Sequence, residues 1–383
     1  MPESSSLPSS IESSDELRRY EHLLEEARRV KGVSLGRDAW RRLRRSPSAM
    51  LSLSVLVVMT LLAFFTPLLP LQSPRAVDTS RNFQAPTINH LWVNHLDLAA
   101  DDADAKIWNE QLRREVDLKY GSVNRLTWLL TRVRVAIFGE KAIGSICGTD
   151  ELGRDLMARL FWGARISLVV GLVATLVSLV IGVSYGAISG YLGGRVDNIM
   201  MRLVDVLYSI PFIFIVIFLI TVLSEDSIKG WLLDHGIDRI TIFFFVVGAI
   251  YWLTMARVVR GQVISLKQEQ FVEAARTLGA SRTRIIFLHL VPNLFSVIIV
   301  YLTLTIPRVM LFEAFLSFLG LGVEPPDVSW GLLANEGLKV ITPVKIYWWL
   351  VVYPGLALGV TLFALNFLGD GLRDALDPRL KNR

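Results

Sequence analysis

The chain has 383 residues, of which 52% are hydrophobic, and its 40 basic and 35 acidic side chains leave a formal net charge of +5. Long uncharged runs in so apolar a chain would aggregate in water, so the composition favours a membrane protein and excludes an ordinary soluble domain. The mild positive charge suits anionic lipid headgroups rather than nucleic acid, and the single cysteine, Cys147, excludes an intrachain disulfide and a multi-cysteine metal cluster.

The first 48 residues are predicted to be a polar tail that ends in an interfacial helix. Ser, Pro and Glu dominate Met1–Ser14, which is typical of a disordered segment, and Asp15–Lys31 has the charge pattern of a solvated helix. Trp40 and the arginines after it are typical of an anchor at the membrane surface. The apolar run that follows is too long for the hydrophobic region of a cleaved signal peptide, so we interpret it as the first membrane span.

Six apolar stretches are long enough, or nearly so, to cross a bilayer, which takes about 20 residues in a helix. We expect all six to be helical, because a backbone in lipid must satisfy its own hydrogen bonds. The sequence therefore predicts an all-α polytopic membrane protein with six transmembrane helices. The stretches are Ala49–Leu71, Ile166–Leu192, Val206–Leu223, Ile240–Ala256, Leu290–Pro307 with an extension to Phe312, and Ile346–Gly369.

Lysine and arginine beside the spans predict the orientation, because short cytoplasmic flanks carry an excess of both. Five arginines between Arg37 and Arg45 precede the first span, so we expect the N-terminus in the cytoplasm, and six spans return the C-terminus to the same side. The cation-rich loop before the fifth span falls there too. Arg154, Arg159 and Arg165 fall on the outer side and depart from the rule, which is weak after a long loop.

Residues 72–147 form a long outer insertion between the first two spans. Its first half is acidic, and Gln111–Phe138 carries apolar residues at roughly helical spacing. We predict a small extracytoplasmic subdomain that lies on the membrane. His90, His95 and Asp97 match no known spacing of metal ligands, so we interpret them as scattered surface polar residues.

A polar motif leads into the second span. Thr149 or Asp150 can cap the helix that follows, and acids of the motif can pair with the three outer arginines. We expect a capped helix start held by salt bridges at the outer surface. The motif consists of Gly148, Thr149, Asp150, Gly153, Arg154 and Asp155.

Glycines recur every four residues in two spans, where they let another helix pack closely. They are Gly182, Gly186 and Gly190 in the second span and Gly355 and Gly359 in the last. Between the second and third spans, Gly193–Tyr208 alternates apolar and charged residues at helical spacing. This pattern predicts an amphipathic helix along the inner face, before Pro211 bends the third span.

A polar, cationic loop at 265–290 separates the fourth and fifth spans. Lys267–Ala275 predicts a short helix that Gly279 ends, because glycine takes a positive φ without steric cost, and Ser281 can cap a second short helix. Such a knob can be gripped by another protein, or the loop is an ordinary helical connector. The residues that distinguish it are Glu273, Ala274, Ala275, Gly279 and Pro292.

Glu313–Gly337 is too short and too broken by glycine and proline to cross a bilayer. We predict a short re-entrant or surface helix that forms part of an external gate, turned at two glycines and stopped by Pro325 and Pro326. Its distinguishing residues are Glu313, Ser317, Phe318, Gly320, Gly322, Trp330 and Gly331.

These motifs, in this order, resemble those of permease subunits of bacterial ABC importers. Glu273-Ala274-Ala275 with Gly279 is similar to the family's EAA loop, although Val291 precedes Pro292 where leucine is usual. The motifs at 148–155 and 313–331 resemble those of oligopeptide and dipeptide permeases of the C type, although Ser145–Cys147 stand where a histidine is frequent. The resemblance covers the chain from the first arginine cluster to the C-terminus, except the insertion.

The resemblance implies an ABC importer type I permease fold in a bacterial inner membrane. It implies a cytoplasmic tail at 1–48, a first helix at 49–71, the outer insertion at 72–147, a five-helix core at 148–372 with the coupling loop, and a cytoplasmic tail at 373–383. The implied partners are a sister permease in a heterodimer, two ABC ATPase subunits and an extracytoplasmic solute-binding protein. The implied cargo is a peptide or a peptide-like solute.

The chain has no phosphate-binding loop that ends in Gly-Lys-Ser/Thr and no evident nucleophile, metal or cofactor motif, so we expect a non-catalytic subunit. The spans contain almost no ionisable residues, which a proton- or sodium-coupled carrier usually needs. A stand-alone secondary carrier or channel is the alternative, and a membrane enzyme or sensor built on the insertion is a weaker one. Co-purification of an ATPase separates the first interpretation from both.

Overall fold

The computed structural model describes residues 35–88, 92–96, 105–120, 124–223, 225–235 and 239–376. The predictions for Met1–Ser14, for Asp15–Lys31, for most of the acidic half of the insertion and for the residues after 376 lie outside these ranges. The helices are α2 (Leu35–Leu43), α3 (Pro47–Phe64), α4 (Ala105–Tyr120), α5 (Arg125–Phe138), α6 (Leu156–Leu192), α7 (Gly194–Ser209), α8 (Phe212–Leu223), α9 (Asp226–Asp234), α10 (Arg239–Leu266), α11 (Gln270–Thr277), α12 (Arg282–Arg284), α13 (Val291–Asn293), α14 (Phe295–Phe318), α15 (Trp330–Lys339) and α16 (Trp349–Leu376). The remaining elements are the 3₁₀ turns η1 (Thr66–Leu68) and η2 (Thr79–Arg81), the π-helical segment η3 (Ile285–Leu290), and strands β1 (Trp92–Asn94) and β2 (Lys141–Ile143).

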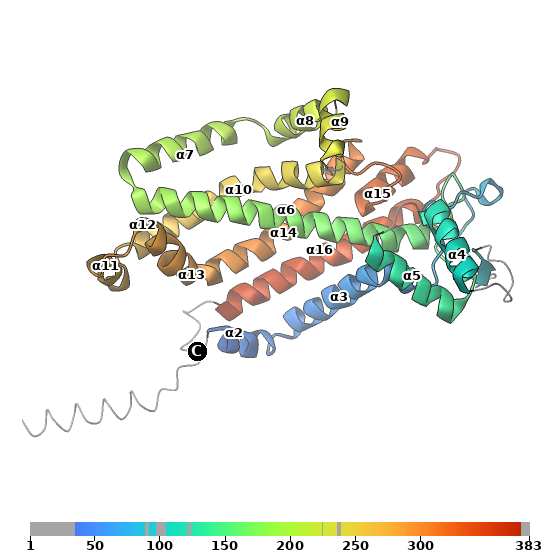
Figure 1. Cartoon of the computed structure of the whole chain (residues 1–383), viewed down its shortest axis with the longest axis horizontal. Coiled ribbons are helices and arrows are strands. Elements are labelled where there is room, and N and C mark those ends of the chain that lie inside the picture. Colours follow the sequence, from blue (N-terminus) through green and yellow to red (C-terminus); the bar gives the residue numbers. More distant parts are fainter. Residues whose placement is uncertain are drawn as a thin grey trace, which may run out of the picture.

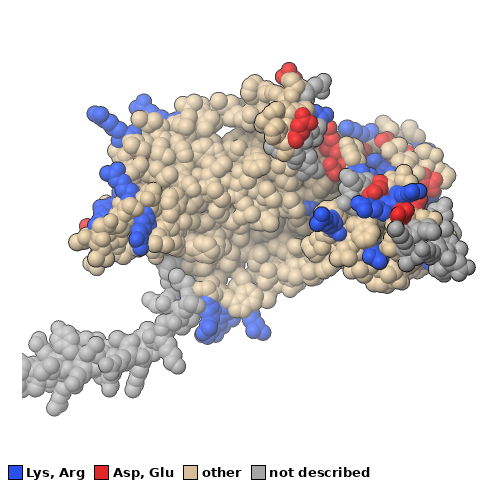
Figure 2. Space-filling model, in the orientation of Figure 1, with Lys and Arg blue, Asp and Glu red and all other residues tan. Residues whose placement is uncertain are grey.

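The long helices lie side by side in one bundle (Figure 1), in which α6 packs along α10 and α3 packs along α16. Figure 2 shows that charged side chains gather at the two ends of the bundle and leave an uncharged band between them. This is the distribution expected of a protein whose middle lies in lipid. We call the two ends the α11 end, at the left of Figure 1, and the α15 end, at the right.

Five helices in the described residues are long and apolar enough to cross a membrane, and α7 with α8 makes a sixth if the bent pair counts as one span. The five are α3, α6, α10, α14 and α16. The all-α polytopic fold predicted from the sequence is therefore confirmed. The helices begin or end several residues away from the predicted runs. α10 continues to Leu266, beyond its apolar run, because hydropathy misses turns in polar surroundings, whereas α3 ends at Phe64, short of the predicted Leu71, where Pro67 and Pro70 follow.

The third predicted span, Val206–Leu223, is not one helix. The chain bends by 87° between α7 and α8, and Ile210 at the break is extended. Proline has no N–H to continue a helix and drives the preceding residue into extended geometry, so Pro211 is the physical cause. The amphipathic helix predicted at Gly193–Tyr208 is α7, which doubles back beside α6 (Figure 1), where Ser189 donates a hydrogen bond to Asp197.

The second-span glycines lie where α6 meets α10. A Cβ at Gly186 would stand 2.3 Å from the carbonyl oxygen of Ala256, and Cβ atoms at Gly182 and Gly190 would also collide with α10 backbone. The two helices can approach this closely because the glycines have no side chains. In contrast, a Cβ at Gly355 or Gly359 would meet no described atom within 4 Å. The sequence led us to expect close helix packing at these glycines, and no described helix of this chain provides it.

The insertion has a small core of its own at the α15 end. β1 pairs antiparallel with β2, and α4 and α5 bury Leu112, Val116 and Val135 around Tyr120. The part of the insertion before β1 instead contacts the bundle: the Phe83 ring stacks on Tyr347, with ring centroids 4.0 Å apart. The half before β1 is thus built into the bundle, whereas the half from β1 to β2, which we call the separable half, has its own core and touches the bundle at Trp162 and Arg165 of α6.

We predict that the separable half is dispensable for membrane insertion. Trp92 and Ile143 are paired residues of β1 and β2, so a two-residue Asn-Gly turn can join them after deletion of Val93–Ala142. This variant should still insert and give a monodisperse particle, measured by membrane fractionation and size-exclusion chromatography. A longer deletion, Phe83–Lys141, also removes the Phe83–Tyr347 stack and should be less stable by about 3 kcal/mol. Failure of the shorter variant to insert would disprove the separation.

Candidate functional site

The loop predicted to couple with another protein forms a compact knob at the α11 end (Figure 1). Its first helix is α11, three residues later than predicted. Val272 and Ala275 are buried against Ile285 and Leu290, and they fix one face of α11 to the bundle. Glu273 and Ala274 face outward and are exposed. The knob is therefore a short helix with one buried face and one free polar face.

A sharp turn follows α11. Gly279 has a φ of +80° and lies beside Leu278, whose side chain is 88% exposed. The N–H of Ala280 donates to the carbonyl of Ala275 and closes the turn. Ser281 then accepts a hydrogen bond from the N–H of Arg284 and caps the next helix, as its position in the sequence suggested. A bare leucine at the apex of a polar turn is a feature that the sequence analysis missed.

The knob is attached to the end of α6. The Arg276 guanidinium lies over the Tyr191 ring at 5.3 Å from its centroid, and Lys267 Nζ donates to the carbonyl of Gly190 at 2.8 Å. Two turns before Lys267, Arg260 of α10 donates two hydrogen bonds to Asp197 of α7, at 2.5 and 2.6 Å. These contacts join α6, α7, α10 and α11, so the knob is fixed to the bundle. Pro292 lies in α13, beyond the turn.

At the α15 end, the motif that leads into α6 forms a buried ionic network. Asp150 accepts hydrogen bonds from Arg154 Nε and Arg159 Nη1, both at 2.7 Å. Arg159 is 1% exposed and also donates to Glu336 of α15, at 2.6 Å. This network connects the start of α6 to α15 across 177 residues of sequence. The pairing of Asp150 with two outer arginines follows the sequence prediction, whereas Glu336 was missed.

The helix cap of the motif differs from the prediction. Asp155, rather than Thr149 or Asp150, caps α6 by accepting from the N–H of Ala158 at 2.8 Å. Asp150 accepts from its own turn and from the arginines, and Thr149 bonds to the insertion at Gln84. The motif glycines allow this fold: Gly148 and Gly153 have positive φ, and a Cβ at Gly153 would overlap the carbonyl of Asp78.

The predicted gate segment is divided between two helices. α14 continues through Pro307 to Phe318, so Glu313 and Ser317 belong to its last turns and not to a separate short helix. A tight turn follows, with Gly320 at a φ of +76° and Gly322 packed against Ser317, and α15 begins at Trp330. Phe318 at the end of α14 is 50% exposed. The prediction ended the span at Phe312, before the charged Glu313, whereas the helix continues through Pro307 and Glu313 to Phe318.

Glu313 joins the two helices from a fully buried position. Its Oε1 accepts hydrogen bonds from Ser317 at 2.7 Å and from Ser329 at 2.8 Å, and Ser329 also caps α15. Trp330 donates through its backbone N–H to Ser167 of α6, and a Cβ at Gly331 would collide with Ala314. The turn between α14 and α15 is thus held against α6 by side chains that come from three helices.

His95 is the histidine of the insertion that the structure describes. Its Nε2 accepts a hydrogen bond from the backbone N–H of Ser73 at 3.0 Å. Burial lowers the pKa of His95 to about 3, assisted by the charges of Arg134 and Lys119, so the ring is neutral. Within the described residues, no group of three His, Cys, Asp or Glu side chains could hold a metal ion. His95 therefore acts as an acceptor inside the insertion and helps to fold it.

Comparisons with known proteins give one consistent result. Residues 182–382 match the model of a family described as "Binding-protein-dependent transport system inner membrane component", and residues 34–86 match the "N-terminal TM domain of oligopeptide transport permease C". The chain is 38% identical to the oligopeptide transport system permease protein OppC of Escherichia coli (strain K12) over 97% of this chain and 98% of that one. It is 46% identical to the dipeptide transport system permease protein DppC of Bacillus subtilis (strain 168), over 61% of this chain and 68% of that one. A solved structure of the MetNI methionine ABC transporter aligns with a TM-score of 0.45 at 17% identity, over 58% of this chain and 98% of that chain.

Proposed function

The chain belongs to the family of binding-protein-dependent transport system inner membrane components, as a permease subunit of the peptide-importer type, and from this premise we propose that it forms half of a translocation path driven by ATPase subunits. The solute is a peptide or a peptide-like molecule, the class carried in the names of the relatives. The subunit binds no nucleotide itself. It works by changing the packing of its helices when its partners move.

The knob carries the proposed contact with an ATPase subunit. A docking helix must be exposed enough to be gripped and anchored enough to transmit force. Glu273, Ala274 and Leu278 meet the first need, because all three are exposed. The contacts of Arg276 with Tyr191 and of Lys267 with Gly190 meet the second. A leucine inserted in an apolar cleft and a glutamate paired across the rim would give both affinity and orientation.

The proposed orientation puts the α11 end in the cytoplasm. Lysines and arginines dominate that end in Figure 2, in agreement with the excess of cations that cytoplasmic flanks carry. α2 packs there on the end of α16, so both described ends of the chain lie on this side. The extracytoplasmic solute-binding protein then docks on the α15 end.

The proposed contact with a sister permease uses α16. Gly355 and Gly359 have open space in front of them, and exposed apolar residues recur beside them at helical spacing. These are Val352, Leu356, Val360, Phe363 and Phe367. Small and apolar residues on one face suit the approach of a second helix in a membrane. The translocation path then lies between two subunits.

Charge reversal at Glu273 tests the knob. In membranes that contain the complete transporter, Glu273→Lys should lower peptide uptake at least tenfold and reduce the ATPase recovered on a tagged permease. Asp370→Lys is the matched control, because it reverses an exposed acid of α16 outside the knob. Equal uptake and equal ATPase recovery in the two variants would leave the knob as a plain connector. Peptide uptake by this chain alone in liposomes, driven by an ion gradient, would instead support a secondary carrier.

A further inference from the structure

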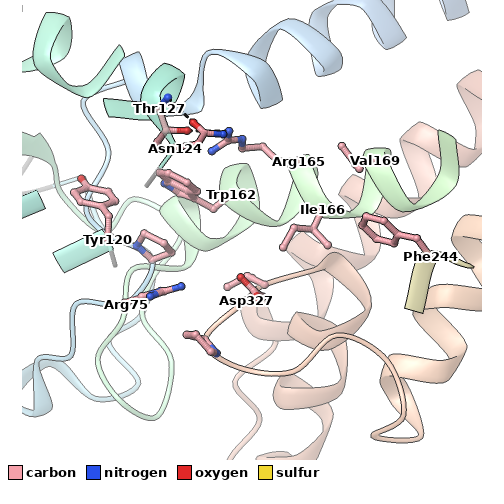
Figure 3. A pocket seen from close by; sticks show the side chains of 13 residues that line it. Arg75, Tyr120, Asn124, Thr127, Trp162, Arg165, Ile166, Val169, Phe244 and Asp327 are labelled. Atoms are coloured by element: carbon pink, nitrogen blue, oxygen red, sulfur yellow. Dashed lines mark hydrogen bonds between the residues drawn. The ribbon is translucent and has the colours of Figure 1, made fainter. Parts of the chain in front are cut away.

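A cavity of about 460 Å³ opens between the insertion and the bundle at the α15 end (Figure 3). One wall is α6, which contributes Trp162, Arg165 and Val169. Figure 3 shows Arg165 pointing toward Thr127 at the start of α5, Arg75 on the other side of Trp162, and Phe244 of α10 at the far end of the cavity from Tyr120. The lining therefore changes from polar and cationic at one side to apolar at the other.

The described lining of the cavity includes two arginines and one carboxylate, that of Asp327. Arg154, Arg159 and Arg165 are the three arginines predicted on the outer side of the membrane. The first two are paired with Asp150 and Glu336. Arg165 is half-buried, lies over the Trp162 ring at 4.9 Å and donates to Thr127 Oγ1 at 3.4 Å. Among the residues that the structure describes, no carboxylate forms an ion pair with Arg165. A partly desolvated guanidinium without an anion is unfavourable unless a ligand supplies one.

An apolar stripe continues from the cavity down α6. Val169 is 44% exposed, and the next residues on that face, Leu172, Leu176 and Val180, are exposed as well. Their spacing of three to four residues places them in one line along the helix. The stripe starts directly beyond Trp162 and Arg165, and tryptophan and arginine are the residues that mark the boundary between headgroups and acyl chains.

We propose that this cavity holds the headgroup of an anionic glycerophospholipid, with the phosphate at Arg165, beside Thr127 of α5, and an acyl chain along the α6 stripe. Arginine binds phosphate through paired N–H donors, which explains why this residue type stands at the polar side. Asp327 also borders the cavity, and its charge disfavours a ligand with more than one negative charge. A phosphodiester headgroup of the phosphatidylglycerol class, with a single negative charge, therefore fits best. In the proposed orientation the lipid belongs to the outer leaflet.

The consequence is a lipid that joins the insertion to the membrane core. The phosphate would contact Arg165 of α6 beside Thr127 of α5, and so add a charged contact between the bundle and the α5 part of the insertion. Lipid class would then set how firmly the insertion is seated on the bundle. A docking partner at the α15 end would meet a platform whose position depends on the outer leaflet.

The test uses the full-length protein with its co-purifying subunits in phosphatidylcholine nanodiscs that contain a minority of phosphatidylglycerol. Mass spectrometry of the retained lipid should find phosphatidylglycerol enriched on the wild type. One cation near a membrane surface changes affinity for anionic lipid about fivefold, so Arg165→Gln should lower the enrichment about fivefold and Arg165→Lys should preserve most of it. The control is Arg132→Gln, which removes an exposed arginine that stacks on Trp128 outside the cavity and should change nothing.

A second pair of variants tests the apolar side without a change in charge. Val169→Trp fills the path at the mouth of the cavity and should lower retention, whereas Ile181→Trp, an exposed apolar position of the same helix that lies off the stripe, should not. Equal enrichment in wild type and Arg165→Gln would overturn the proposal. Two other results would also overturn it. If Arg165→Gln lost a co-purifying permease while lipid enrichment stayed the same, the cavity would be a protein interface. If Arg165→Gln raised the KM for peptide uptake while lipid enrichment stayed the same, the cavity would be a site for the carboxylate of the solute.

Discussion

Replacing Gly279 with arginine is expected to abolish uptake while the chain remains inserted in the membrane. The turn needs the φ of +80° that Gly279 adopts, and a residue with a Cβ resists this geometry by about 1–2 kcal/mol. No described atom lies within 4 Å of the Cβ position, so the cost arises from the backbone and not from a collision. A relaxed turn would move Leu278 and displace α11 from its docking position. The measurement is peptide uptake together with ATPase recovery on the tagged chain.

Smaller substitutions at Gly279 separate backbone geometry from bulk. Asparagine tolerates positive φ better than alanine, so Gly279→Asn should retain more uptake than Gly279→Ala although its side chain is larger. Gly261→Arg is a matched control, because Gly261 has an ordinary helical φ and equally open space on α10. The proposal fails if uptake falls with side-chain size alone, or if Gly261→Arg is as damaging as Gly279→Arg.

Replacing Arg159 with methionine should destabilise the chain by about 3 kcal/mol, because it removes the more deeply buried of the two arginines that pair with Asp150 and breaks the contact with Glu336. Arg159 is 1% exposed and is the residue of the ionic network that contacts both Asp150 and Glu336 at under 3 Å. We expect a large fall in the amount of protein that survives detergent extraction and a lower midpoint in thermal unfolding. α15 should also detach from the start of α6, which limited proteolysis of the loop between α14 and α15 can detect.

A double variant shows whether the loss comes from charge. Asp150→Asn removes the buried charge that Arg154 alone would then compensate, but it keeps an acceptor for the N–H groups of Leu152 and Arg154, so it should restore part of the stability lost in Arg159→Met. Arg132→Met is the control on an exposed outer arginine, expected to stay within about 0.5 kcal/mol of wild type. Additive losses in the double variant would show that Asp150 and Arg159 do not act as a pair.

Local chemistry predicted much of the knob. The signals for a helix end and a helix start each lie within one turn of the chain. Gly279 could therefore be predicted to end α11, and Ser281 to cap the next helix, directly from the sequence. The spans were predicted for a similar reason, because the bilayer demands apolar residues over a fixed length. The exposed Leu278 was missed, since nothing in its neighbours indicates which face of the turn it occupies.

Features that depend on distant partners escaped prediction. Glu336 completes the ionic network from a helix 177 residues away, and no local pattern points to it. The choice of Asp155 as cap over Thr149 or Asp150 depends on which residue the insertion and Arg159 already engage. Likewise, the bend at Pro211 was expected, but the direction in which α7 runs depends on its contact with α6.

The length of α6 has a mechanical consequence. Its 37 residues make a rod of about 55 Å, whereas the hydrocarbon core of a bilayer is about 30 Å thick. One end of this rod carries Arg159 and its ionic network, and the other end carries Tyr191 beneath the knob. A straight helix of this length that tilts by about 5° shifts one end by about 5 Å relative to the other. A tilt that starts at Tyr191 would therefore reach Arg159 as a displacement larger than the length of a hydrogen bond, without any change inside the helix.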